Sequence, residues 1–62
     1  MRLTPREKQV ALLVAATKTD RDIALVLELS FHTVRDYVKA IFRKLQVHKR
    51  TAVSAALAKE IW

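Results

Sequence analysis

The hydrophobic positions of this chain recur at helical spacing in four segments, and residues that can cap a helix precede the first three. Thr4, Pro5 and Glu7 form a capping box, with Thr as the cap, Pro at the first helical position and Glu reaching back. The pattern predicts a helix over residues 5–16, with an apolar face made of Val10, Leu13, Val14 and Thr17.

The next two segments predict a short helix followed by a longer one. Thr19 can cap a helix over residues 20–27, where Asp20 and Asp22 place negative charge in the first turn. Ser30 can cap a helix over residues 31–45, with Leu29 as an apolar plug before it. The inward positions are Ile23, Ala24 and Leu27, and then Val34, Val38, Ile41, Phe42 and Leu45.

A short helix, a three-residue connection and a longer helix with a basic outer face is the helix-turn-helix plan. That outer face carries His32, Arg35, Asp36, Lys39 and Arg43. An α-helix that presents such a face outward can fill the major groove of DNA.

The last segment predicts a helix over residues 50–60. Its inward side carries Val53, Ala56, Leu57 and Ile61, and the terminal Trp62 is expected to cover the core or a dimer seam. The opposite side is largely alanine, with Ala52, Ala55 and Ala58, so a second helix can approach it closely. The fold class expected is therefore all-α, a single four-helix helix-turn-helix domain over residues 1–62.

Composition narrows the possible functions. The 62 residues hold no cysteine, no glycine and one proline, which excludes disulfides and disfavours a hairpin-rich fold. Twelve Lys and Arg against six Asp and Glu give a net charge of +6, which favours a polyanionic partner such as nucleic acid. There is no apolar run long enough to span a membrane and no signal peptide, so we expect a cytoplasmic protein associated with the nucleoid.

Taken together, these segments resemble the LuxR/GerE-type helix-turn-helix family, the DNA-binding module of quorum-sensing regulators and many two-component response regulators. The residues that carry the resemblance are Leu3-Thr4-Pro5-Arg6-Glu7, Val10, Leu13, Asp22-Ile23-Ala24, Leu27-Glu28-Leu29-Ser30, Thr33-Val34, Ile41, Lys44-Leu45, Val47 and Arg50-Thr51. Each fragment is a modest signal, but together they cover nearly the whole chain at the family's spacing.

The resemblance implies a bacterial-type transcription regulator in which the third helix reads double-stranded DNA and the fourth forms a weak homodimer on a two-half-site operator. It places Arg35, Asp36 and Lys39 where base-edge contacts occur, and Thr33, Lys44 and Arg50 where phosphate contacts are common. His32 and Arg43, on the same outer face, are further candidates for phosphate contacts.

Four positions depart from the family pattern. Glu28 stands where the family usually has glycine and Gln46 where it often does, so we expect one or both turns to adopt a different geometry. Tyr37 replaces a common histidine at a position expected to be partly buried. Asp36 can accept a hydrogen bond from cytosine N4 or pair with Lys39 or His32, which leaves the target sequence open.

Other functions fit the sequence less well. No nucleophile–base pair or phosphate-binding glycine loop indicates an enzyme, no cofactor is expected, and the widely separated His32 and His48 do not suggest a metal site. A module that docks on RNA polymerase is the main alternative, for which Leu12, Leu25 and Val26 offer outward apolar side chains. A basic membrane-surface peptide is disfavoured, and the chain can be either a small regulator or one domain of a larger protein.

Overall fold

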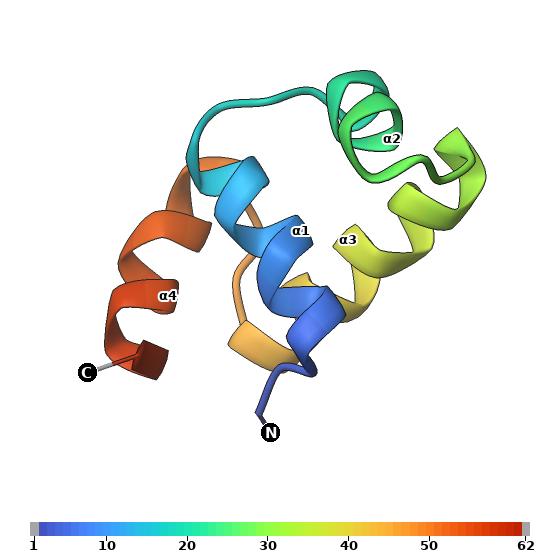
Figure 1. The fold of residues 1–62 in the computed structure, drawn as a ribbon. Helices are drawn as coiled ribbons and strands as arrows, with labels where there is room; N and C mark the ends of the chain where they lie inside the picture. The colour runs from blue at the N-terminus through green and yellow to red at the C-terminus, as the bar shows by residue number, and fades with distance from the viewer. Residues whose placement is uncertain (1, 62) are drawn as a thin grey trace.

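The computed structural model describes the backbone of residues 2–61 and the side chains of residues 2–59. The elements in this part of the chain are α1 (Pro5–Ala15), α2 (Asp20–Leu27), α3 (Phe31–Leu45), a 3₁₀ turn η1 (Arg50–Ala52) and α4 (Val53–Ile61). Helix α1 lies in the middle, with α4 on one side and α2 and α3 on the other (Figure 1). The all-α, four-helix architecture expected from the sequence is confirmed.

The first three helices begin with the side-chain caps that the sequence predicts. Thr4 accepts from the Glu7 N–H at 3.2 Å, and the Glu7 carboxylate accepts from the Thr4 N–H at 2.8 Å. Thr19 and Asp22 form a second reciprocal box with both distances at 3.1 Å, where the sequence had indicated only a cap and a charge. Ser30 accepts from the N–H of Thr33 at 3.0 Å, so these helices begin where predicted.

The ends of α1, α2 and α3 share one geometry, although the chain has no glycine to adopt it. Thr17, Glu28 and Gln46 all lie in the left-handed region, with φ of 65°, 56° and 56°. After each of them, an N–H bonds back to a carbonyl five residues earlier: Lys18 to Leu13, Leu29 to Ala24 and Val47 to Phe42, at 3.0, 2.9 and 3.0 Å. The expectation that the turns at Glu28 or Gln46 would depart from this geometry was wrong.

The structure corrects the predicted bounds of the first and last helices. Helix α1 ends at Ala15, and Thr17 lies beyond it as an exposed residue instead of extending the buried face. The last helix opens with the 3₁₀ turn, which contains Ala52, and its α-helical part runs from Val53 to Ile61. The inward position predicted for Ile61 and the covering role predicted for Trp62 lie outside the described side chains.

The core forms around α1 and includes residues of every α-helix. Its buried hydrophobic members are Leu3, Val10, Ala11, Val14, Ile23, Val34, Ile41, Val53 and Leu57. Around them pack partly buried side chains that include Leu13, Ala24, Leu27, Leu29, Tyr37, Val38, Phe42 and Leu45. Because α3 contributes Val34 and Ile41, both fully buried, its rotation about its own axis is fixed and its opposite face points to solvent.

Candidate nucleic-acid interface

The outer face of α3 is a row of exposed polar side chains. His32, Arg35, Asp36, Lys39 and Arg43 are all exposed, as predicted. Helix α3 packs against α2, and its first turn lies beside that helix, away from α4 (Figure 1). The predicted base-reading residues Arg35, Asp36 and Lys39 therefore stand together on one face, within the first nine residues of α3.

Arg35 also has an aromatic neighbour that the sequence reasoning missed. Its guanidinium carbon lies 5.9 Å from the centroid of the Phe31 ring, one helical turn earlier on α3. Phe31 is 49% exposed, so about half of its surface is open to solvent. The sequence did contain a signal for this contact, because side chains four residues apart are neighbours on the surface of a helix.

The first turn of α3 presents features that suit an anion. It holds no acidic residue, so the positive end of the helix dipole is not neutralised locally. Thr33 is partly buried, and its hydroxyl accepts a hydrogen bond of 2.8 Å from the Ser30 hydroxyl. That hydroxyl keeps its own proton to donate, and exposed His32 lies beside it in the chain.

Lys44, predicted to contact phosphate, is held inside the domain by an acidic partner. Its ammonium lies 2.7 Å from the carboxylate of Glu7, and the two side chains are 21% and 8% exposed. The same carboxylate oxygen accepts from the Thr4 N–H, so one oxygen both caps α1 and binds the ammonium of Lys44 on α3. The hydrogen bond from Lys44, with that from Thr4, holds the pKa of Glu7 below its ordinary value despite burial.

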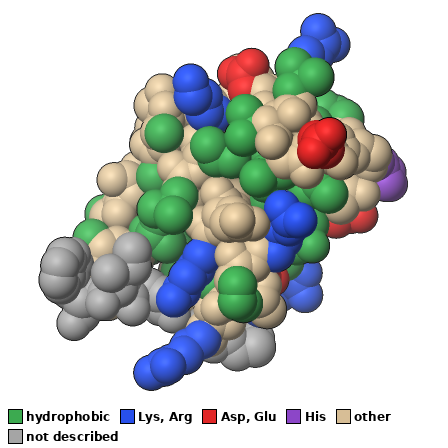
Figure 2. Space-filling view, in the orientation of Figure 1, with side chains coloured by type: hydrophobic (Ala, Val, Ile, Leu, Met, Phe, Trp, Pro, Cys, Tyr) green, Lys and Arg blue, Asp and Glu red, His purple; other side chains and the backbone are tan. Residues whose placement is uncertain are grey.

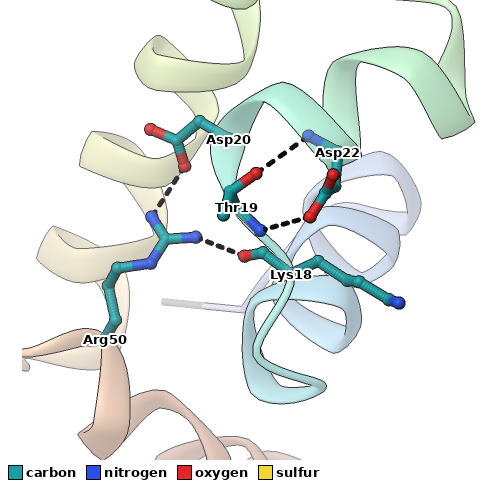
Figure 3. A network of polar contacts seen from close by, with 5 residues as sticks. All are labelled: Lys18, Thr19, Asp20, Asp22 and Arg50. Atoms are coloured by element: carbon teal, nitrogen blue, oxygen red, sulfur yellow. Dashed lines mark hydrogen bonds and ion pairs between the residues drawn. The ribbon is translucent and has the colours of Figure 1, made fainter.

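Arg50, a further predicted phosphate contact at the start of η1, also has internal partners. Its guanidinium donates to Asp20 at 2.7 Å and to the carbonyl of Lys18 at 2.9 Å. Figure 3 shows it reaching from η1 to the start of α2, beside the reciprocal bonds of Thr19 and Asp22. The hydrogen bond from the Thr19 backbone holds the pKa of Asp22 below its ordinary value. Asp20 and Asp22 place two carboxylates in the first turn of α2 (Figure 3).

On the face shown in Figure 2, basic side chains are scattered and hydrophobic ones lie among them. Leu12, Leu25 and Val26 are 53%, 74% and 61% exposed, which confirms their predicted outward positions. On α4, Ala55 and Ala58 are exposed, whereas Ala52 is partly buried within η1. Of the three alanines predicted to form a dimer contact, two are therefore exposed on α4, and the third, Ala52, is not.

Two further features concern the part of the chain that the structure describes. None of its helices combines the length and the apolar character needed to cross a membrane. No cluster of three or more His, Cys, Asp or Glu side chains in residues 2–59 is arranged to hold a metal ion. His32 lies in the first turn of α3, whereas His48 lies beyond the end of that helix, three residues after Leu45.

Comparison with known proteins agrees with this geometry. Residues 1–56 match the family of bacterial regulatory proteins of the luxR type. The chain is 40% identical over 60 residues to the uncharacterized transcriptional regulatory protein YvfU of Bacillus subtilis, covering 97% of this chain and 30% of that protein. It is 46% identical over 48 residues to the transcriptional regulatory protein DesR of the same organism, covering 77% of this chain and 24% of DesR.

A third relative is the two-component response regulator PprB of Pseudomonas aeruginosa, 37% identical over 57 residues, which cover 92% of this chain and 21% of PprB. The chain thus spans less than a third of the length of these relatives. No solved structure gives a significant match. With its four helices and its α2–α3 helix-turn-helix, the chain belongs to the luxR family of bacterial regulatory proteins, as a non-enzymatic DNA-binding domain.

Proposed function

We propose that this domain binds double-stranded DNA in a sequence-specific manner, with α3 in the major groove. One observation carries the proposal: five polar side chains stand exposed on one face of α3, while Val34 and Ile41 on the opposite face are fully buried. The core therefore holds a rigid helix whose outward face can enter a groove about 12 Å wide. Membership of the luxR family supports the same use of α3.

Different residues are proposed to read bases and to contact phosphates. Arg35 and Lys39 donate to base edges, guanine O6 and N7 above all, and Asp36 accepts from cytosine N4. His32, Thr33 and Arg43 contact phosphates on either side of the groove. These assignments follow from their positions on the exposed face and in the first turn of α3.

Lys44 and Arg50 can contact phosphate only by sharing their charge with an internal carboxylate. Lys44 carries three N–H donors and Arg50 five, so each retains donors after binding Glu7 or Asp20. Since both charges are partly neutralised inside the domain, we propose that they strengthen binding less than Arg43 does. Arg43→Ala should therefore weaken DNA binding more than Lys44→Ala does, although each variant removes one positive charge.

Selection of bound sequences from random duplex DNA tests the proposal directly. The wild type should recover a defined motif, and Arg35→Ala or Lys39→Ala should each relax preference at one base pair and cost about 1–3 kcal/mol. Lys8→Ala, which removes an exposed charge from α1, is the control and should leave the motif unchanged. If the wild type recovers no motif, the proposal of sequence-specific binding is wrong.

Salt dependence separates DNA binding from docking on a protein such as RNA polymerase, the second candidate. That candidate rests on exposed Leu25 and Val26 of α2. With three or four phosphates neutralised per subunit, log K should fall against log salt with a slope of about −3 per monomer. A slope near zero would favour a protein partner.

We also propose a weak homodimer through α4, assembled on an operator with two half-sites. Ala55 and Ala58 are exposed and small, so two copies of α4 can approach closely. A two-fold pair would set the reading helices about 34 Å, one DNA turn, apart. Because the contact is narrow, the domain is expected to be largely monomeric when free.

A further inference from the structure

We propose that Phe31 is a specificity-determining residue that positions Arg35 to read guanine. The inference rests on the proposed DNA-binding function and deepens it. Its starting point is the pair itself: Phe31 begins α3, and the Arg35 guanidinium lies over its ring at 5.9 Å. No core role accounts for the exposed half of the ring.

Phe31 lies at the edge of a hollow next to the start of α2. Together with Thr19, Asp20, Arg21 and Arg50 it lines a shallow hollow beside the start of α2. The Arg50–Asp20 ion pair belongs to the same hollow and ties η1 to α2 at that point. The ring therefore stands beside a second element, with the Arg35 guanidinium over its face.

Stacking and base reading use different parts of a guanidinium. The attraction to an aromatic ring engages its flat face, whereas its N–H donors point outward in its plane. Arg35 can therefore stay over Phe31 and still donate two parallel hydrogen bonds to guanine O6 and N7. The ring removes rotamer freedom from Arg35 before DNA arrives, so less is lost on binding.

Without the ring, Arg35 would reach neighbouring phosphates as readily as a base. It would then contribute to affinity for any sequence, because phosphate contacts carry no sequence information. The expected result is a change in discrimination with little change in overall affinity. The attraction at an exposed site corresponds to roughly a two- to five-fold effect.

The experiment uses the whole chain and four duplexes that differ only at the base pair whose preference Arg35→Ala relaxes. Phe31→Leu should lower the preference for guanine there two- to five-fold. Phe31→Tyr should keep it, and combining Phe31→Leu with Arg35→Ala should add nothing to Arg35→Ala alone. Gln9→Ala, which trims an exposed side chain of α1, is the control and should change none of the four affinities.

A readout without DNA checks the same contact. In the wild type, NMR should show the Arg35 side-chain protons shifted by the ring current of Phe31, and Phe31→Leu should abolish that shift. The inference is overturned if Phe31→Leu keeps the guanine preference. A second set of four duplexes varies the neighbouring base pair instead. The inference is also overturned if Phe31→Leu loses a preference for thymine there, because Phe31 would then touch a methyl group itself. Failure of the proposed function would appear earlier, as a wild type that selects no motif.

Discussion

Glu7 combines two roles in one side chain, because its carboxylate caps α1 and neutralises Lys44 of α3. Glu7→Gln keeps the size of the side chain but leaves the largely buried ammonium without a counter-charge. We expect a loss of about 1–3 kcal/mol in the free energy of unfolding at pH 7, measured by urea denaturation. Glu28→Gln, the same change at an exposed position, should have little effect.

The same residue gives the wild type a distinctive response to acid. The pKa of Glu7 is lower in the folded than in the unfolded chain, so protonation favours unfolding. Its contribution is complete above the ordinary glutamate pKa of about 4.3 and is lost as the pH falls through the lower folded value. The difference in stability between wild type and Glu7→Gln should therefore shrink as the pH is lowered below about 4.3; a constant difference would contradict this cause.

The role of Glu7 as a cap could be predicted from the sequence, and its pairing with Lys44 could not. A cap depends on residues three positions apart, whereas the ion pair joins residues separated by 37 positions. Such a pair forms only after α1 and α3 have docked, and hydrophobic periodicity does not give their relative rotation. For the same reason Lys44 and Arg50 were predicted as phosphate contacts without their internal partners.

At the scale of the elements, the sequence predicts where a helix begins better than where it ends. Thr4, Thr19 and Ser30 are strong caps by residue type, whereas the usual glycine signal for a helix end is absent from this chain. The end of α1 at Ala15 and the left-handed Thr17 were therefore missed. The outer face of α3 was predicted in full because fifteen residues give a clear period.

Thr17 offers the most direct test of these ends, since a β-branched residue is the least suited to φ of 65°. Thr17→Gly should raise the free energy of unfolding by about 0.5–1 kcal/mol, the relief of the left-handed strain less the backbone entropy of glycine. The exposed bond from the Thr17 hydroxyl to the Ala16 carbonyl is lost as well, which trims the gain. Ala16→Gly, one residue earlier at φ of −82°, should destabilise instead, and equal effects would contradict the strain.

For the whole molecule, the proposed dimer would set how two copies of α3 meet DNA. Ala55→Glu places a charge on the exposed side of α4, where a second copy is proposed to pack. Gel-shift titrations should show that cooperative binding to a paired site is abolished while affinity for a single half-site changes little. Gln9→Glu, which adds the same charge on α1, should leave cooperativity intact. If Ala55→Glu binds the paired site as tightly as the wild type, Leu12, Leu25 and Val26 become the next surface to test.

Arg50 has a consequence for how the domain opens locally. Helices α2 and α4 lie on either side of α1, yet the Arg50 side chain joins the turn that leads into α4 to Asp20 and the Lys18 carbonyl. Detachment of α4 would pull Arg50 away and release the first turn of α2, so these segments should exchange their amide hydrogens as one cooperative unit. A partner that holds α4 in place would thereby slow the opening of the helix-turn-helix without touching it.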